Sequence, residues 1–465
     1  MNLKNHPGYS EVPEVCLVWA RKAPKIGAQS EDFPREKETV CKFLKEGVEL
    51  QKSKDRLSAP DKNGAARLKF INSVLADVRH QFLLTHRAAI YSDLTQNFKK
   101  SIRVEELVEE VALKYSGLVS SADQLKEDAA RALKDKVGYE RSIGIFISHI
   151  FADPDAGNHL IQNMLRPLPS SLELLEKFRK EGSLDLGTVL VKRNGASVEV
   201  RMYNPQYLNA EDTGTLYPME QAVDVALLDS ESQVCVLRGT KSAHPRYKDR
   251  GVFCSGINLT HLYNGEIPYL WYITRDLGFV NKMAHGIWTQ SSQSGDPMPT
   301  TEKPWIAAVE TFAIGGGCQY LLVMDHTLAE ESAYFTLPAR KEGIIPGLAN
   351  MRLPRLVGDR LSRQAIMFDR RIEASSPEGR LVADQIIPDG EMDQALSVTV
   401  EKLTSSGVVS AAGNRKALRV CQETLDDVRR YMAVYSREQV NCHLSPALVS
   451  NLEENWLKPK AARAG

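Results

Sequence analysis

Three consecutive glycines are followed by Cys318 and Gln319 in the segment ETFAIGGGCQYLLVMDH, which spans residues 310–326. Glycines allow a ligand to approach the backbone closely, and the first N–H groups of a helix have no partner within that helix. A glycine-rich turn at a helix start therefore favours an anion, either a phosphate or an oxyanion formed during a reaction. Tight packing of a strand against the helix explains such a run equally well.

This glycine run lacks the features of the common nucleotide-binding motifs. Tyr320 stands where the dinucleotide fingerprint requires its third glycine, and no Gly-Lys-Ser/Thr follows as in a P-loop. A second turn lies in RGVFCSGINL (250–259), where the N–H of Ile257, just after Gly256, can face the same pocket. Two backbone N–H groups from separate turns form an oxyanion hole, in which the loss of one donor typically costs roughly 2.7–4 kcal/mol.

The elements that must position these turns change in character along the chain. Residues 1–187 place apolar side chains at three- and four-residue steps, as in RLKFINSVLADVRHQFLLTHRAAIYSDL (67–94), which predicts an α-helical N-terminal domain. TVLVKRNGASVEVRMYN (188–204) alternates apolar and polar residues around an Asn-Gly turn and predicts a hairpin. Strands and helices then alternate, which predicts an α/β core over 188–390 and a helical region over 391–465.

The composition argues against several classes of function. Lys+Arg and Asp+Glu both number 59 among the 465 residues, and this formal net charge of +0 is unlike that of a general nucleic-acid or membrane-surface binder. Seven scattered cysteines and a polar, mixed N-terminus predict reduced thiols and a cytoplasmic location. The ten histidines form no H-x-H or H-E-x-x-H group, so we expect no catalytic metal.

Four segments in order resemble the signature blocks of the crotonase (enoyl-CoA hydratase/isomerase) superfamily: RGVFCSGINL, KPWIAAVETFAIGGGCQ, FTLPARKEGIIPG and GRLVADQIIP. NAED (209–212) resembles the start of the first helix of that fold. The resemblance covers about residues 188–390 and implies an α/β core, a ββα spiral, that binds an acyl-CoA thioester. It also implies that the N–H groups of Ile257 and Gly316 hold the thioester oxygen and stabilise an enolate.

The departures from the family pattern narrow the chemistry. The two glutamates that hydratases of this family use as acid and base are replaced here by Gln319 and Ala339. A carboxylate can exchange protons with water near neutral pH, whereas an amide and a methyl group cannot. The chain is therefore expected to form an enolate without hydrating a double bond. A catalytically inactive subunit with the same fold is the alternative.

The whole chain, including its helical N-terminal part, resembles a branch of the family formed by cofactor-independent dioxygenases that act on a dihydroxyphenylacetyl-CoA. This resemblance implies that the enolate reduces O2 directly, that the peroxide attacks the thioester, and that CoA leaves, with no metal or flavin. A small apolar pocket would hold the oxygen. The residues expected around it are Leu259, Leu262, Ala339 and Ile344.

Recognition of two ring hydroxyls requires polar side chains. The resemblance points to Glu211 and Gln319, together with Arg275, which lies in an apolar helical run where a charge is costly unless it is paired. A buried pair between Arg275 and Glu211 would satisfy both the charges and a phenol. The alternative is a surface ion pair of Arg275 with Asp276 or Glu266.

The CoA moiety needs contacts to its phosphates. Arg246, in SAHPRYKDRG (242–251), is the candidate, although a solvated loop explains this segment equally well. Further substrate contacts are expected from Ser255, Asn258, Gly315 and Gly317.

Two other functions remain open from the sequence. One is another enolate-forming crotonase, such as an isomerase, a decarboxylase or a thioester hydrolase, and the other is a non-catalytic scaffold or CoA-binding subunit. The resemblance and the helical C-terminal region predict a homo-hexamer made of two trimers. The role of the N-terminal helices and the group that takes the α-proton stay open. Oxygen consumption separates the dioxygenase from the alternatives.

Overall fold

A computed structural model describes residues 3–27, 32–52, 62–289 and 299–458. The chain divides into two compact units, which we call the helical unit and the sheet unit. The helical unit contains Met1–Ala130, Lys136–Leu160 and Met432–Asn441. The sheet unit contains Arg131–Asp135, Ile161–Tyr431 and Cys442–Gly465, so the two units are interleaved along the chain.

Amphipathic helices build the helical unit, as their three- and four-residue apolar steps predict. The longest, α3, buries Phe70, Val74 and Val78 on one face. Ser121 begins α5 with a capping box that it shares with Gln124. In the described parts of the chain, no helix is both long and apolar enough to cross a bilayer. The helices that lie wholly in this unit are α1 (Glu14–Arg21), α2 (Phe33–Lys52), α3 (Lys62–Leu94), α4 (Val104–Lys114), α5 (Ala122–Ala129) and α6 (Arg141–Ala152). The first part of α7 (Pro154–Met164) and most of α18 (Leu425–His443) belong to it as well.

The boundary between the two units comes earlier in the chain than residues 187–188, where the sequence pattern changes. Helix α7 (Pro154–Met164) ends inside the sheet unit, and α8 (Pro169–Glu181) packs against α9 (Thr213–Leu228) there. The Ser171 hydroxyl on α8 donates a 2.7 Å hydrogen bond to the Asp224 carboxylate on α9. The pattern change therefore marks the start of the predicted Asn-Gly hairpin, whereas the packing boundary lies at residues 160–161.

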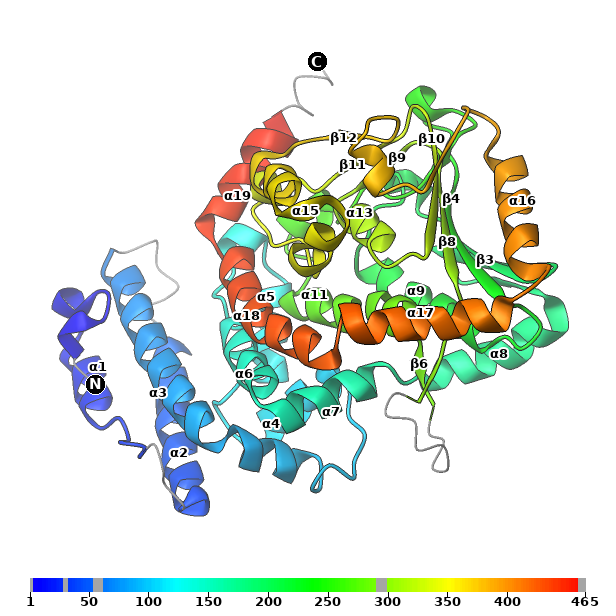
Figure 1. Cartoon of the computed structure of the whole chain (residues 1–465). Coiled ribbons are helices and arrows are strands. Elements are labelled where there is room, and N and C mark those ends of the chain that lie inside the picture. The colour runs from blue at the N-terminus through cyan, green and yellow to red at the C-terminus, as the bar shows by residue number, and fades with distance from the viewer. Residues whose placement is uncertain (1–2, 28–31, 53–61, 290–298, 459–465) are drawn as a thin grey trace. The chain divides into compact units, whose positions relative to one another are not determined.

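The main sheet has eight strands, in the order β1-β2-β3-β4-β8-β10-β13 with β5 paired to β4. Strands β1 to β3 are antiparallel, and the predicted hairpin joins β2 to β3. The pairs from β3 to β13 are parallel, and Figure 1 shows β3, β4, β8 and β10 side by side. The strands are β1 (Ser183–Asp185), β2 (Val189–Asn194), β3 (Ser197–Met202), β4 (Val234–Lys241), β5 (Gly251–Val252), β8 (Trp305–Val309), β10 (His326–Glu330) and β13 (Gln385–Ile387).

Helices cover both faces of this sheet. Successive residues of a strand point to opposite faces. On β4, Val236 packs in a cluster with Met392 and Leu396 of α16 (Met392–Thr404). Its neighbour Cys235 instead directs its Sγ to the Ala226 carbonyl on α9, at 3.6 Å. A sheet covered on both faces explains why successive residues of β4 and β8 are buried instead of alternating between buried and exposed.

A smaller sheet, in the order β12-β11-β9, lies next to the glycine run. Its strands are β9 (Phe312–Ile314), β11 (Tyr334–Thr336) and β12 (Ile372–Glu373). The N–H of Gly315 donates to the Thr336 carbonyl at 2.8 Å, which holds the turn after β9 on this sheet. A short hairpin of β6 (Ile287–Trp288) and β7 (Thr300–Thr301) precedes β8.

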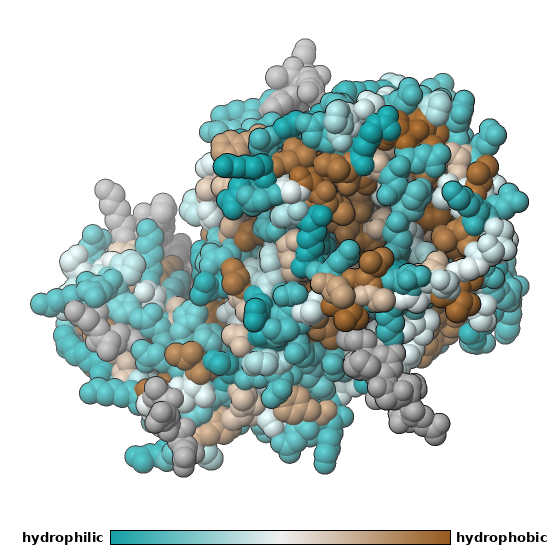
Figure 2. Space-filling view, in the orientation of Figure 1, coloured by the Kyte–Doolittle hydropathy of each residue, from teal (hydrophilic) through white to brown (hydrophobic). Residues whose placement is uncertain are grey.

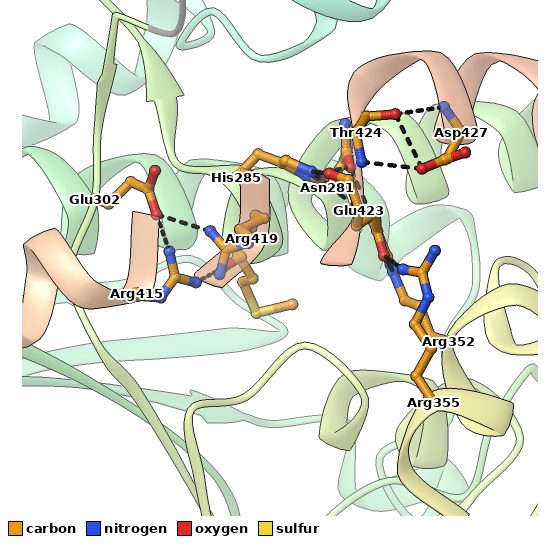
Figure 3. Close-up of polar contacts among 11 residues, drawn as sticks. Asn281, His285, Glu302, Arg352, Arg355, Arg415, Arg419, Glu423, Thr424 and Asp427 are labelled. Carbon is orange, nitrogen blue, oxygen red and sulfur yellow. Dashed lines mark hydrogen bonds and ion pairs between the residues drawn. The ribbon is translucent and has the colours of Figure 1, made fainter. Parts of the chain in front are cut away.

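Two groups of ion pairs hold helix α17 (Val408–Gln422) on the sheet unit (Figure 3). Near the middle of α17, Arg415 and Arg419 both pair with Glu302. Directly after its last residue, Glu423 binds Arg352 and Arg355 of α15 (Ala349–Phe368), at 2.7 and 3.0 Å. The sequence then enters α18 (Leu425–His443), which Thr424 and Asp427 cap reciprocally. These pairs fix the C-terminal helices to the core of their own chain.

The surface of the sheet unit carries apolar side chains on its C-terminal helices. Val398 of α16 is 58% exposed, and Val409, Leu418 and Val420 of α17 are between 55% and 84% exposed. In Figure 2, brown atoms interrupt the hydrophilic surface where Figure 1 shows α16 and α17. On α17, Val409 and Val420 share one face because eleven residues make about three turns, whereas Leu418 lies on the opposite side. Exposed large apolar side chains on one face are typical of a surface that another protein covers.

Candidate active site

The two glycine turns predicted to share a pocket do lie against each other. Gly256 and Gly315 have φ angles of 84° and 52°, a region that favours glycine. A Cβ built on Gly315 would lie 3.5 Å from the Cα of Gly256. The Cys254 carbonyl accepts a 3.0 Å hydrogen bond from the Ile314 N–H, which joins the two segments just before their turns.

The N–H groups of Ile257 and Gly316 are not used for hydrogen bonding within the described residues. The groups that flank Ile257 form a parallel bridge: Glu211 N–H donates to the Gly256 carbonyl at 2.8 Å, and Asn258 N–H donates to the Glu211 carbonyl at 2.7 Å. Ile257 itself points its N–H away from that bridge. Gly316 begins α13 (Gly316–Leu321), where the first N–H groups have no helical acceptor. Both donors are available for the predicted oxyanion hole.

A cavity of about 640 Å³ opens beside these turns, and Ile257 is part of its wall. Of the other residues predicted to contact substrate, Ser255, Asn258 and Leu259 also line it. Its volume lies within the range of small-molecule sites in proteins. Ser255 donates to the Tyr207 carbonyl at 3.0 Å, and Asn258 caps α10 (Leu259–Tyr263) through the His261 N–H. The side chains of Ser255 and Asn258 therefore hold the cavity wall in place through hydrogen bonds to other residues of the same chain.

Arg275 is buried and lies at the centre of a polar cluster. Its Nε and Nη2 donate to the two carboxylate oxygens of Glu211, at 2.7 and 3.1 Å. Its Nη1 donates to Asp276 at 2.8 Å and to the Gln319 side-chain oxygen at 2.9 Å. The Tyr320 hydroxyl donates to Glu211 as well. Arg275 thus pairs with both Glu211 and Asp276, and because Asp276 is buried too, neither contact is a surface ion pair.

Burial and the neighbouring carboxylates have opposite effects on the pKa of Arg275. Burial alone would lower the pKa of Arg275, but the carboxylates of Glu211 and Asp276 raise it well above its usual value. Burial and the Glu211 charge raise the pKa of Tyr320. Arg275 therefore stays a cation and Tyr320 a neutral donor, so the cluster offers fixed hydrogen bonds instead of a group that titrates near neutral pH.

Two glycines make room for the cluster. A Cβ on Gly316 would lie 1.6 Å from Oε2 of Glu211. A Cβ on Gly347 would lie 2.3 Å from the Gln319 side-chain oxygen and 2.8 Å from the Asp276 carboxylate. At position 317 it is Cys254 that leaves no room for a side chain, since a Cβ built on Gly317 would lie 2.7 Å from the Cβ of Cys254. The glycine run therefore serves tight packing at position 317 and accommodates the polar cluster at position 316.

The polar cluster also holds the turn at Gly316 in place. Arg275 Nη2 donates to the Gly316 carbonyl at 3.1 Å, which fixes the peptide that follows the predicted donor. The wall of the 640 Å³ cavity includes Ala210 and Ile257 but neither Glu211 nor Arg275. Contact of Glu211, Arg275 and Gln319 with a substrate ring stays a prediction, whereas their hold on the Gly316 turn is visible in the structure.

The four residues predicted to surround an oxygen pocket lie on two short helices or, for Ile344, just after one of them. Leu262 and Ala339 are buried, and Leu259 and Ile344 are half-buried. Ile344 follows α14 (Ala339–Glu342) and donates its N–H to the Ala339 carbonyl at 3.1 Å. Of the four, Leu259 reaches the wall of the 640 Å³ cavity. A shared apolar pocket of all four residues stays a prediction.

Cations lie at the same cavity, although sequence reasoning named a different one. Arg246 is exposed in the 3-10 turn Pro245–Tyr247, beside the wall residues His244 and Tyr247. Lys341 and Arg371 line the cavity directly. They were not predicted because they belong to the segments after β11 and before β12, which only the fold brings to this place.

Glu342 is the titratable residue that sequence reasoning missed. It is half-buried in the cavity wall, at the end of α14. Burial raises the pKa of its carboxyl to about 8, and the neighbouring Asp369 carboxylate adds to the rise. Its position three residues after Ala339 was the available signal, since residues three apart in a helix share a face.

Known proteins similar to this chain cover it to different extents. A (3,5-dihydroxyphenyl)acetyl-CoA 1,2-dioxygenase from Amycolatopsis orientalis is 40% identical over 389 residues, which is 83% of this chain and 88% of the relative. A probable enoyl-CoA hydratase from Rhizobium meliloti (strain 1021) is 27% identical over 247 residues, 52% of this chain and 86% of the relative. A solved enoyl-CoA hydratase from Mycobacterium avium subsp. paratuberculosis K-10 is 20% identical over 58% of this chain and 99% of that chain, with a TM-score of 0.48.

A family model matches about half of this chain. The enoyl-CoA hydratase/isomerase model matches residues 192–434, which contain both glycine turns, the polar cluster and α14. The 40% identity to a relative aligned over most of its length supports the same assignment. From its sequence blocks, its mixed sheet and these matches, the chain belongs to the enoyl-CoA hydratase/isomerase (crotonase) family.

Proposed function

We propose that this chain is a cofactor-independent dioxygenase that converts 3,5-dihydroxyphenylacetyl-CoA and O2 to 3,5-dihydroxyphenylglyoxylate and CoA. The observation that carries the proposal is the extent of the match to the Amycolatopsis orientalis dioxygenase. That match covers 83% of this chain, whereas the hydratase relatives cover between 50% and 52% of it. The dioxygenase thus shares more of this chain than the family core alone.

The site supports an enolate as the reacting species. The thioester oxygen would accept hydrogen bonds from the N–H groups of Ile257 and Gly316, which have no acceptor among the residues that the structure describes. Such donors stabilise the negative charge that develops on that oxygen when the α-proton leaves. An aryl ring on the α-carbon adds conjugation, which makes the enolate easier to form and richer in electrons.

The proposed reaction balances without an added reductant. The enolate carbon forms a bond to one oxygen atom of O2, and the terminal peroxide oxygen attacks the thioester carbon and expels the CoA thiolate. Loss of the second α-proton then breaks the O–O bond and leaves a ketone beside a carboxylate. Four electrons leave the α-carbon and dioxygen takes all four, so no metal or flavin is needed. Both oxygen atoms end in the product.

Gln319 and Ala339 suit this chemistry better than glutamates. A hydratase positions water between two carboxylates, whereas a peroxide-forming site gains from excluding water. The Gln319 oxygen already accepts a hydrogen bond from Arg275, and Ala339 leaves a buried methyl group near Ile344. The apolar side chains of Leu259, Leu262 and Ile344 would keep the reacting carbon dry.

The remaining parts of the proposal concern the CoA phosphates, the oligomeric state and the cellular location. We place the CoA phosphates near Arg246, Lys341 and Arg371, where the cavity is lined by cations. We expect a homo-hexamer of two trimers that uses the apolar surface of α16 and α17. All seven cysteines are free thiols, which agrees with a cytoplasmic location.

Labelled dioxygen tests the proposal. Chelator-treated protein is incubated with 3,5-dihydroxyphenylacetyl-CoA under labelled O2, and the product is weighed by mass spectrometry while free thiol is measured. We expect one CoA released per O2 consumed and two labelled oxygen atoms in the α-keto acid. Label that arrives from water, or activity that returns only with added iron or flavin, would end the proposal. Thiol release without oxygen uptake would assign a thioester hydrolase, and binding without turnover a scaffold.

A further inference from the structure

The enolate requires a base, and the site residues predicted from the sequence do not supply one. Gln319 and Ala339 cannot accept a proton, and Glu211 is committed to Arg275 and Tyr320. His261 lies nearby, but its Nδ1 is 3.1 Å from the Asp212 carboxylate and its Nε2 is 3.3 Å from the Tyr207 hydroxyl. Its two ring nitrogens therefore face partners within the chain. The α-proton needs a different acceptor.

We propose that the Glu342 carboxylate removes the α-proton of the bound thioester, a role that rests on the proposed function. Its side chain lines the same cavity as Ile257. Both of its carboxylate oxygens lie 3.9 Å from the place where a Cβ on Gly315 would sit, and the Cα of Gly256 lies 3.5 Å from that same place. The carboxylate thus faces the junction of the two turns that carry the oxyanion donors.

Helix α14 explains how the carboxylate arrives there. Ala339 occupies the position where family hydratases carry a catalytic glutamate, and Glu342 follows it by three residues in the same helical turn. Side chains at this spacing lie on one face of a helix. The methyl group at 339 leaves room on that face, and Glu342 lies on the same face of α14. The helix thus carries a carboxylate at position 342 in place of one at position 339.

The surroundings of Glu342 suit a base. Among the described residues, no hydrogen bond or ion pair engages its carboxylate, and its backbone N–H donates to Pro338 within the turn. Burial and the Asp369 charge at the end of α15 raise its pKa to about 8. A base is most effective when its pKa lies near the working pH. The other titratable groups that line the cavity are Tyr207, His244, Tyr247, Tyr334, Lys341 and Arg371.

One carboxylate can serve both proton transfers. In the first, the α C–H bond breaks, its electron pair enters the enolate, and the proton moves to a Glu342 oxygen. Glu342 can then give that proton to the departing CoA thiolate, which restores the carboxylate. The restored base takes the second α-proton as the O–O bond breaks. One proton leaves with the thiol and the other with the product acid, as the balanced reaction requires.

Hydrogen–deuterium exchange isolates the first transfer. Arylacetyl-CoA is incubated with the protein in D2O without oxygen, and loss of the α-protons is followed by NMR. We expect Glu342→Gln to slow exchange by about 10²–10⁴-fold, the usual contribution of a general base. Glu342→Asp should keep part of the rate. Exchange by the wild-type protein should rise with pH through about 8, because Glu342 must be deprotonated to act.

Three controls separate chemistry from folding. Glu331→Gln makes the same substitution at an exposed carboxylate and should leave exchange unchanged. Asp369→Asn removes the neighbouring charge and should move the pH midpoint of exchange downward without abolishing it. Thioester affinity and thermal unfolding of Glu342→Gln should match the wild type within about threefold in Kd and a few degrees.

The outcomes distinguish this inference from the proposed function. If Glu342→Gln exchanges at the wild-type rate while the wild type consumes O2, Glu342 is not the base and the dioxygenase stands. If the wild type exchanges but consumes no O2, and Glu342→Gln does not exchange, Glu342 is the base and the dioxygenase falls. Absence of exchange in the wild type overturns the role of Glu342, and absence of both exchange and O2 uptake overturns both proposals. Loss of exchange and of O2 uptake in Glu342→Gln alone supports both.

Discussion

At the scale of one residue, the guanidinium of Arg275 both holds the Gly316 turn and belongs to the cluster predicted to bind the substrate ring. The guanidinium binds Glu211 with two hydrogen bonds, the Gln319 amide with a third and the Gly316 carbonyl with a fourth. The bond to Gly316 orients the peptide next to a predicted oxyanion donor. The bond to Gln319 fixes the amide that replaces the family glutamate. A change at Arg275 therefore affects both the turn and any ring that reaches the cluster.

Replacing Arg275 tests which of these roles dominates. Arg275→Ala leaves Glu211 buried without its cation, at a cost of roughly 3–5 kcal/mol in the free energy of unfolding. If the cluster also binds the ring hydroxyls, kcat/KM for 3,5-dihydroxyphenylacetyl-CoA should fall far more than kcat/KM for phenylacetyl-CoA, and we expect this result. Equal losses with the two substrates would confine Arg275 to holding the Gly316 turn.

At the scale of elements, α17 depends on charges at two separate points. Glu302 binds two arginines of α17, and Glu423 binds two arginines of α15 (Figure 3). Helix α15 begins two residues after Gly347, whose missing side chain makes room for Gln319. The Tyr431 hydroxyl on α18 also donates to the Gly347 carbonyl. The C-terminal helices therefore support the segment that closes over the polar cluster.

The pH dependence of stability checks the pairing at Glu423. Burial would raise the pKa of Glu423, but Arg352, His285 and Arg355 together hold it at about 2, below the usual 4.5. A depressed pKa means that the stabilisation is fully present above about pH 4.5 and is lost as the pH falls toward 2. Glu423→Gln should destabilise the protein by roughly 3–5 kcal/mol at pH 7, because Arg352 stays buried.

Urea unfolding of both proteins between pH 3 and pH 7 supplies the measurement. The difference between wild type and Glu423→Gln should shrink below pH 4.5. Glu438→Gln, at a half-exposed surface pair with Arg437, should change stability by less than about 0.5 kcal/mol. A Glu423→Gln difference that stays constant across this pH range would show that the ion pairs contribute nothing.

The sequence predicted the parts of this site that depend on local pattern. The glycine run, the Asn-Gly hairpin and an arginine in an apolar helix each have a short-range cause, and the structure contains all three. Asp276, Tyr320 and Gly347 join the cluster through contacts that no local pattern encodes. Glu342 was not predicted because its approach to Gly315 joins two segments that are distant in the sequence. The packing boundary near residue 160 differs from the pattern change because α8, although helical, packs against α9 in the sheet unit.

At the scale of the whole molecule, the exposed apolar face of α16 and α17 supports the expected hexamer (Figure 2). The wild type should sediment as a hexamer at micromolar concentration. Val420→Glu places a charge on the face that Val420 shares with Val409 and should produce smaller species, since an unpaired charge is costly to bury in an interface. Val420→Met keeps the side chain apolar and should preserve the assembly. A wild-type monomer in analytical ultracentrifugation would contradict the assembly.

The charge count around Arg275 limits what a glutamate at 319 could do. One guanidinium already serves the carboxylates of Glu211 and Asp276, so a glutamate at 319 would bring a third carboxylate to a single cation. Its pKa would rise, because two of the charges nearest to it would be negative. Glutamates at 319 and 339 would therefore not give two carboxylates of ordinary acidity, and Asp276 would have to change as well.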